Sequence, residues 1–516
     1  MRHDGNERFG LCPLHHPAFR GGDLGRRDFL KGVAIASAVA GAALGTLGQV
    51  AAAEETAPKL PATKKPPVLK VGYVRHAQAV CGGWPGHGFN NETACREYSR
   101  KLQAMGKELG VEIDLADATI TDDAGAERFI KAAQGQRPDA LMILPMGIFS
   151  MWDRANRIFE ALKLPTLVFT QIGTSFTMNT APIARKRGFH LTSSLDIGDV
   201  RPGLEMVKTA STLKQSTLLV LGRNDYRGTV FEGDVFGLLG TKLEFVAGEE
   251  YVKSYNRVGI TDDVRRFAEA AIKGAKEVKE VTQQDIEQAA RHYFASKGLL
   301  AEHGADGLTA VCLHLCQQVG TPCLGFSRLM DEGIAAGCEA DIGSAMTMML
   351  IHNLLGRPGY MADPLVDTAQ NLFANAHCNS PTKLDGFDKA PAEYILRAHH
   401  GGGHWVSPQV LWRIGQVFTL SRFQRPDMLI VDRAKVVCNY DSPPSAACIT
   451  NTGAIVEGAE DDPHKVAGFH VLQIYGDHVG KLRAFCQLYG IEAVHSWDKR
   501  VSFDFEPNCA PSAPGA

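Results

Sequence analysis

The 516-residue sequence lacks the short motifs that identify most nucleotide-dependent and serine-dependent enzymes. It contains no G-x-G-x-x-G, no G-x-x-x-x-G-K-[ST] and no G-x-S-x-G motif, so nicotinamide enzymes, P-loop enzymes and α/β-hydrolases are all disfavoured. Its formal net charge is only −3, and no basic stripe compensates locally. Because long-range attraction for nucleic acid or for an anionic membrane is missing, we expect neither as a partner.

Paired cysteines are also missing. The twelve cysteines are scattered, without a C-x-x-C pair or a repeated spacing. Several of them, such as Cys312, Cys316 and Cys323, lie in or beside apolar runs that look like strands. Buried free thiols are the simplest interpretation.

The N-terminus closely resembles a twin-arginine export signal. The stretch GRRDFLKG contains Arg26 and Arg27 and is followed by the uncharged run GVAIASAVAGAALGTLGQV and by small residues. We therefore expect residues 1–53 to be a signal peptide and the protein to be exported to the periplasm. An uncleaved membrane anchor is the alternative, although the run is poor in Leu, Ile and Phe for a spanning helix. Beyond export, we expect no contact with the membrane.

Strand-like and helical segments alternate after a Pro/Lys-rich linker at residues 54–67. The apolar strands LKVGYV, ALMILPM and TLVFT are separated by helical stretches around residues 91–110, 124–133 and 151–162. Such alternation predicts a parallel sheet covered on both faces. We assign residues 68–180 to a first α/β lobe.

A second alternating set predicts a second α/β lobe at residues 181–355. Its expected strands are TLLVLG, LEFVAGEEYV, GLTAVCLHL and CLGFSRLM, beginning at Thr217, Leu243, Gly307 and Cys323. Short strands and Gly/Pro-rich turns follow, so we expect residues 356–516 to form a β-rich C-terminal domain, closed by the helix HVGKLRAFCQLYG. The predicted fold class is therefore α/β, with two doubly wound lobes followed by a β-rich domain.

Two acidic residues directly precede an apolar segment in the stretch GCEADIGSAMTMMLIH. Glu339 and Asp341 precede a run of methionines and aliphatic residues that predicts a buried helix. Unpaired buried charges are costly, so each acid must either cap the helix at the surface or be held by something positive. We expect Asp341 to be the cap. For Glu339, a cap is the alternative to a metal ligand.

Further acids and histidines occur where strands of the C-terminal part should end. Asp363 lies in GYMADP, His377 in ANAHCNSP and His470 in AGFHVLQIYGDH. Carboxylate and imidazole without thiolate suit a cation such as Mn²⁺ or Mg²⁺ better than structural zinc. Spacing this wide cannot by itself identify a site.

Three of these segments resemble the L-fucose and L-arabinose isomerase family. CEADIGSAMTMMLIHNLLGRPGYMADP is similar to the fucose isomerase segment in which a Glu precedes an apolar helix and an Asp follows it at the same separation. FHVLQIYGDHVGKLRAFCQLYGIEAV resembles the closing segment shared by both enzymes, and AHCNSP resembles a His-containing loop of the arabinose enzymes. The resemblance extends over residues 320–500. For the preceding part it implies two Rossmann-like lobes.

The resemblance implies a metal-dependent aldose–ketose isomerase, which is an intramolecular oxidoreductase. It makes Glu339 and Asp363 the paired acids that hold Mn²⁺, or another divalent cation, and move the proton. It makes His470 the imidazole ligand and His377, from the arabinose branch alone, a fourth ligand. In such enzymes a carboxylate carries a proton between neighbouring carbons of an open-chain sugar through an enediol. The family also implies a homo-oligomer, a hexamer or trimer, with sites completed across subunits.

Other polar residues are weaker candidates for the site. The stretch RAHHGGGHWVSP offers His399, His400 and His404, which could form a separate metal site, part of a substrate lid or a polar surface loop. Arg75 follows the first strand, where α/β sheets place ligands, and could contact sugar hydroxyls of a neighbouring subunit. We expect His352 and the methionines of the same helix to be core residues.

Export does not suit an aldose–ketose isomerase, because such enzymes usually serve cytoplasmic catabolism. Two alternatives therefore stay open. One is an exported carbohydrate-binding or sensing protein without turnover, and the other is a metal-dependent sugar epimerase or lyase that uses the same enediol chemistry. In each case the expected ligand is a small-molecule sugar.

Overall fold

The structure is a computed structural model that describes residues 64–82, 88–148, 150–222, 233–399, 405–441 and 448–501. The expected signal peptide at residues 1–53, most of the expected linker, His400 and His404 lie outside these residues. In the described part of the chain, every helix is too short or too polar to span a membrane.

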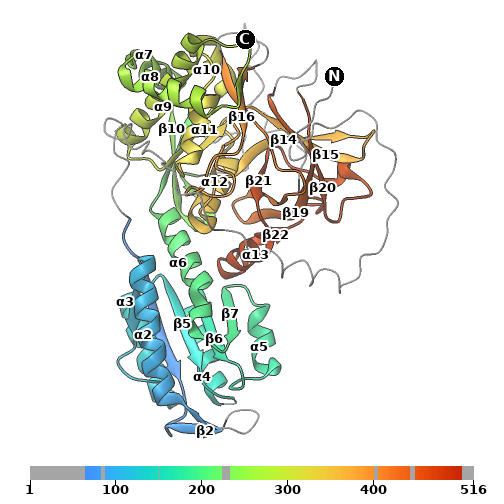
Figure 1. Ribbon diagram of the computed structural model, residues 1–516. Coiled ribbons are helices and arrows are strands. Elements are labelled where there is room, and N and C mark those ends of the chain that lie inside the picture. The colour runs from blue at the N-terminus through green and yellow to red at the C-terminus, as the bar shows by residue number, and fades with distance from the viewer. Residues whose placement is uncertain are drawn as a thin grey trace, which may run out of the picture.

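The first sheet is parallel throughout and lies at the bottom of Figure 1, with the strand order β4-β1-β5-β6-β7. This order is one of the common doubly wound arrangements. Every residue of β5 is buried, as expected for a strand that helices cover on both faces. The strands are β1 (Val68–Val74), β4 (Glu112–Leu115), β5 (Ala140–Pro145), β6 (Thr166–Gln171) and β7 (Phe189–Ser194).

The helices predicted beside this sheet are confirmed. They are α2 (Asn91–Leu109), α3 (Asp123–Gln136) and α4 (Ser150–Leu162), and α5 (Thr177–Ala184) follows them. Local signals fix their ends. For α2, the side chain of Asn90 accepts a hydrogen bond from the Thr93 amide, and Gly110 ends the helix with a φ of 71°.

The second sheet has the strand order β13-β12-β8-β10-β9 and is parallel except for its edge strand β9. Helix α6 (Arg201–Lys214) runs from the first sheet towards the second (Figure 1). The strands are β8 (Thr217–Leu221), β9 (Val235–Phe236), β10 (Thr241–Val246), β12 (Gly307–Ala310) and β13 (Ala335–Cys338). The helices that connect these strands are α7 (Gly248–Arg257), α8 (Asp262–Gly274), α9 (Gln283–His303), α10 (Cys312–Val319) and α11 (Cys323–Asp331).

Three of the strands predicted for this region were wrong or too long. CLGFSRLM forms helix α11, and the sheet instead ends with the short strand β13, which the sequence did not suggest. LEFVAGEEYV and GLTAVCLHL each begin as a strand and continue as a helix, α7 and α10 respectively. Short apolar runs are compatible with a buried helix as well as a buried strand, so periodicity alone could not separate them.

The C-terminal part contains a closed antiparallel barrel, which confirms the expected β-rich character. Six strands pair in the cycle β18-β21-β14-β15-β20-β19, and β19 returns to β18. They are β14 (Tyr360–Asp367), β15 (Leu372–His377), β18 (Val417–Arg425), β19 (Met428–Asn439), β20 (Thr450–Val456) and β21 (Val471–Tyr475). A hairpin of β16 (Tyr394–Ala398) and β17 (Val406–Val410) pairs with β11 (Glu277–Val278), and α13 (Val479–Leu488) is followed by β22 (Glu492–Val494).

Helix α12 (Ile342–Leu355) packs against β13 of the second sheet and β18 of the barrel. Twelve of its fourteen residues are buried, which explains why it is apolar on all sides. Its three methionines are core residues, and Nδ1 of His352 lies 3.0 Å from the Gly333 carbonyl oxygen. The prediction that His352 and these methionines are core residues is therefore confirmed. The prediction of buried free thiols is also confirmed, because the ten cysteines in the described part of the chain are free and mostly buried.

Candidate metal centre

Strand register brings three of the predicted ligands together at one end of the barrel. In the pairing of β14 with β15, Asp363 lies opposite Ala376, next to His377. In the pairing of β14 with β21, Ala362 lies opposite Val471, next to His470. As a result, Nε2 of His470 lies 3.2 Å from Oδ1 of Asp363.

Glu339 reaches the same place from the second sheet. It directly follows β13, and its Oε2 lies 3.7 Å from Nε2 of His470. Ligand atoms of Glu339, His377 and His470 all lie within 4.8 Å of one another. The structure therefore gathers all four predicted ligands where the carboxyl end of β13 meets the barrel, which is where open α/β sheets place their ligands.

The backbone is strained at this point. Glu339, Ala340 and His470 adopt the left-handed conformation, with φ values of 58°, 53° and 52°. A residue other than glycine pays roughly 1–2 kcal/mol for this conformation. Such strain is commonly held at functional sites, where the fold forces side chains into one place. Here it occurs at two of the four predicted ligands.

Asp341 combines the expected cap with a second set of contacts. Its Oδ1 accepts a hydrogen bond of 2.9 Å from the Ser344 amide, so it caps helix α12 as predicted. Its Oδ2 accepts hydrogen bonds from Nη1 of Arg422 and from Nδ1 of His470, the latter over 2.9 Å. Arg422 also donates to the carbonyl oxygen of His470 over 3.1 Å. Asp341 thus holds the ring of His470 as well as the helix.

The charges in this group explain its protonation. Burial disfavours the ionised form of Asp341, but the charge of Arg422 and the hydrogen bond from His470 hold its pKa well below the usual range. Burial would likewise lower the pKa of His470, but the hydrogen bond to Asp341 and the charges of Asp363 and Glu339 raise it. The site therefore attracts positive charge at Nε2 of His470, between the two acids.

His377 presents a different nitrogen to the cluster. Its Nδ1 accepts a hydrogen bond of 2.9 Å from the Cys378 amide, so the proton of the neutral ring is on Nε2. Burial lowers the pKa of His377, which favours this neutral form. In this orientation the ring offers an N–H donor. It can act as a metal ligand only if the ring turns over and presents a nitrogen lone pair.

The donor atoms fit a divalent cation. Carboxylate oxygens and imidazole nitrogens are suitable ligands for Mn²⁺ or Mg²⁺. In the described part of the chain, Nε2 of His470 and Nε2 of His377 are buried and make no hydrogen bond. Buried polar atoms are normally paired, and a cation beside Nε2 of His470 would supply a partner.

The cluster is open to solvent on one side. Asp363 lines a hollow of about 500 Å³, together with residues of the loop before β21 such as His464 and Phe469. The Asp363 side chain is 32% exposed and that of Glu339 16%, whereas His470 is fully buried. A small molecule in this hollow could therefore reach Asp363, while the histidine stays buried.

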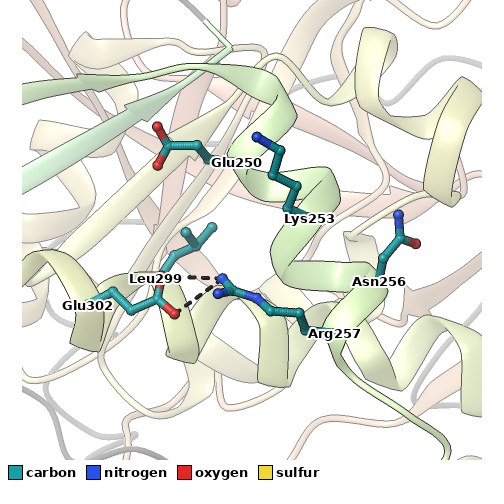
Figure 2. Close-up of a pocket in the computed structure, with 6 residues that line it drawn as sticks. All are labelled: Glu250, Lys253, Asn256, Arg257, Leu299 and Glu302. Carbon is teal, nitrogen blue, oxygen red and sulfur yellow. Dashed lines mark hydrogen bonds and ion pairs between the residues drawn. The ribbon is translucent and has the colours of Figure 1, made fainter.

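A second hollow, of about 580 Å³, contains none of these residues (Figure 2). Glu250, Lys253, Asn256 and Arg257 line it from α7, and Leu299 and Glu302 from α9. Arg257 and Glu302 form an ion pair of 3.2 Å across it. Its charges largely compensate each other at the surface, so we assign it no chemistry.

The remaining predicted contacts are not part of the cluster. Arg75 lies after β1 and donates hydrogen bonds to Thr119, to the His76 carbonyl and to Asn91, all near the first sheet.

Arg422, which holds Asp341, was not predicted from the sequence, although the sequence does contain an indication of its role. It stands alone as a charged residue in the apolar strand VFTLSRF, and such a residue needs a buried partner.

No protein-family model matches the chain. The chain is 26% identical over 160 residues to the sulfoquinovose isomerase of Clostridium sp. (strain MSTE9), which covers 30% of this chain and 35% of that enzyme. The chain thus spans about a third of the length of this curated relative.

Two solved structures match 57% of the chain at very low TM-scores. One is a sugar ABC transporter protein from Yersinia enterocolitica subsp. enterocolitica 8081, with 12% identity, 80% coverage of that chain and a TM-score of 0.17. The other is GanP, a glucose-galactose binding protein from Geobacillus stearothermophilus, with 10% identity, 93% coverage and a TM-score of 0.18. Scores this low carry no argument about fold or function.

Proposed function

We propose that this protein is a metal-dependent sugar isomerase that converts an aldose to a ketose. The observation that carries the proposal is the cluster of Glu339, Asp363 and His470 beside a hollow open to solvent. The similarity to a sulfoquinovose isomerase over 160 residues supports the same class of reaction. The substrate we propose is a small-molecule sugar in its open-chain form.

Glu339, Asp363 and His470 would hold the cation, for which Mn²⁺ is our first choice. When bound, the cation would acidify the proton on the carbon next to the sugar carbonyl. Asp341 accepts a hydrogen bond from Nδ1 of His470, so Nε2 is the nitrogen that would face the cation and would release its own proton when the cation binds. His377 would join as the fourth ligand after turning its ring over, or donate its Nε2 proton to a sugar oxygen.

The two acids are placed to move the proton. Both side chains reach solvent, whereas the histidines behind them are buried. A carboxylate such as Asp363, which lines the hollow, can take the proton from one carbon of the sugar and return it to the neighbouring carbon through an enediol. This chemistry uses no redox cofactor, in agreement with the missing nucleotide motifs.

The test is a sugar screen with the full-length protein supplied with Mn²⁺ in deuterated water. Ketose formation together with deuterium on the carbon that loses its proton is the expected result. Glu339→Gln should lower turnover about 100- to 10,000-fold, since it removes a proton-transfer group. Glu269→Gln is the matched control, because Glu269 is exposed on α8. Its turnover should equal that of the unmodified protein.

Two outcomes would contradict the proposal. Inversion at the same carbon without ketose formation would indicate an epimerase. Sugar binding without any turnover or deuterium exchange would favour a carbohydrate-binding or sensing protein.

The proposal also includes export through the twin-arginine route to the periplasm and assembly as a homo-oligomer, either a hexamer or a trimer. Arg75 would then contact sugar hydroxyls only if a neighbouring subunit brought the first sheet to the site. Native mass spectrometry of the protein recovered from the periplasm would test both parts, because it reads the subunit number and the loss of residues 1–53 in the same spectrum.

A further inference from the structure

A second group of metal-binding side chains lies directly beside the acidic centre. Ligand atoms of Cys323, Cys378 and His399 lie within 4.8 Å of one another. The exposed fractions of these residues are 3%, 4% and 5%, so the group is buried. None of them takes part in the proposed isomerase chemistry.

The thiols in this group are in direct contact. Cys323 and Cys378 share a hydrogen bond, and Cys323 also interacts with His399 and Ser407. A third thiol, Cys448, adjoins Cys378 from the start of β20. Two thiols and an imidazole, with another thiol next to them, are the donor types found in tetrahedral zinc sites.

Three separate parts of the fold deliver these side chains. Cys323 begins helix α11, Cys378 follows β15 and His399 follows β16. Strand contacts and hydrogen bonds fix these positions. Ser327 on α11 donates to the Ser380 carbonyl over 2.7 Å, and the His399 amide donates to the Trp405 carbonyl over 2.6 Å. The group is therefore preorganised by well-packed backbone.

A buried hydroxyl lies at the same place. Ser407 is fully buried, and its side chain interacts with the Cys323 thiol. The hydroxyl would therefore lie beside a metal ion held by the two thiols.

We propose that Cys323, Cys378 and His399 form a binding site for a zinc-class divalent cation, with the fourth position open to Cys448 or to water. Around tetrahedral zinc, with Zn–S bonds of about 2.3 Å, the ligand atoms are roughly 3.5–4 Å apart. The three ligands need only a small contraction to reach that geometry. The site is independent of the proposed isomerase reaction.

The bound ion would connect α11 to the barrel and to the β16–β17 hairpin. It would also lie next to the acidic centre, because Cys378 follows His377 in the chain. The two centres differ in donor chemistry. Thiolates select zinc-class ions, whereas the carboxylates of Glu339 and Asp363 suit Mn²⁺ or Mg²⁺. The protein could therefore hold two different metals a short distance apart.

Cobalt(II) is the probe that separates the two centres. The full-length protein is reduced, freed of metal with a chelator and titrated with Co²⁺. A thiolate-to-cobalt charge-transfer absorption should appear and should disappear again when Zn²⁺ is added. Carboxylate and imidazole ligands cannot give this absorption, so binding at Glu339 and His470 does not contribute to it.

Variants assign the absorption to residues. Cys323→Ser and His399→Gln should lose it, whereas Cys486→Ser on α13, another buried free thiol, should keep it. Glu339→Gln should also keep it, which distinguishes this site from the acidic centre. Added Zn²⁺ should raise the melting temperature of Glu339→Gln but not that of Glu339→Gln combined with Cys323→Ser, since the acidic centre is weakened alike in both.

The proposal would be overturned if the reduced, unmodified protein gave no thiolate absorption with excess Co²⁺. That measurement needs no variant, so a failure of a variant to fold cannot obscure it. It would also be overturned if the absorption persisted in Cys323→Ser.

Discussion

Nδ1 of His470 donates a hydrogen bond to Oδ2 of Asp341 over 2.9 Å, and this contact fixes which nitrogen of the ring faces the two acids. With Nδ1 bonded to Asp341, the ring turns Nε2 toward the two acids, 3.2 Å from Asp363 and 3.7 Å from Glu339. Carboxylates that orient metal-binding histidines in this way are common partners in metal sites. Asp341 is therefore a positioning residue for the proposed centre.

Replacing Asp341 should affect both stability and metal binding. In Asp341→Asn the buried charge of Arg422 loses its counter-charge, which should cost about 3–5 kcal/mol in the free energy of unfolding. Loss of the oriented ring should weaken Mn²⁺ binding by about 10- to 100-fold. Urea unfolding and metal titration measure the two effects. A residue that served only as a helix cap would cost about 1 kcal/mol and leave metal affinity unchanged.

The control for this prediction is a double-mutant cycle with Arg422. Removing both charges in Asp341→Asn with Arg422→Met should destabilise the fold less than the sum of the two single changes, because no buried charge is then left alone. Additive losses would contradict the idea that the two side chains act as a pair.

The two histidines should differ in their effect on metal binding. His470→Ala removes the nitrogen that faces both acids and should abolish binding of Mn²⁺ at micromolar concentrations. His377→Gln should weaken binding less, because the inward nitrogen of His377 carries a proton in this structure. Elemental analysis and calorimetric titration of the two full-length variants provide the measurement. Equal losses would show that His377 turns over and ligates the metal directly.

The family resemblance supplied the proposed members of the acidic centre, whereas the residue pattern alone could not bring them together. Glu339, Asp363, His377 and His470 are spread over 132 residues (470 − 339 + 1), and only the pairing of β14 with β15 and β21 brings three of them together. That register depends on long-range strand pairing, which local patterns do not encode. The paired role of Asp341 was missed for the same reason, since its partners are 81 and 129 residues away.

The elements of the fold also divide into those that local sequence predicts and those that depend on long-range packing. Helices with clear caps, such as α2 and α9, follow directly from the residues at their ends. The short apolar run CLGFSRLM predicts a strand, but the segment forms helix α11, which packs against α9. Buried Cys323 likewise looked like an ordinary core thiol until the fold brought Cys378 and His399 beside it.

Packing between α9 and α11 makes a testable prediction at Gly325. A Cβ atom added there would lie 2.7 Å from the Tyr293 amide nitrogen and 3.1 Å from the His292 carbonyl carbon. Both atoms are backbone, so the helices would have to move apart, and Gly325→Ala should cost about 1–3 kcal/mol. Gly135→Ala in α3 is the matched control. Its Cβ would meet nothing within 4 Å, and it should stabilise the protein by about 0.5–1 kcal/mol.

His292 should make the stability of the protein depend on pH in the acidic range. The ring is buried on α9, with Nδ1 2.9 Å from the Tyr251 hydroxyl and Nε2 3.0 Å from the Val319 carbonyl oxygen. Burial lowers its pKa from 6.5 to about 3, so the folded protein keeps the ring neutral while the unfolded chain takes up a proton. The unfolded state is therefore favoured progressively as the pH falls from 6.5 towards 3.

The contribution of His292 should be constant above its unfolded pKa and should shrink below it by about 1.4 kcal/mol for each pH unit. His292→Gln removes the titrating group. It should lower stability near neutral pH, where the two hydrogen bonds are lost or weakened, and flatten the decline between about pH 6 and about pH 4. Urea unfolding at a series of pH values measures both effects. If the variant and the unmodified protein lost stability in parallel over this range, other groups would account for the acid sensitivity and the ring of His292 would have to be charged or mobile in the folded state.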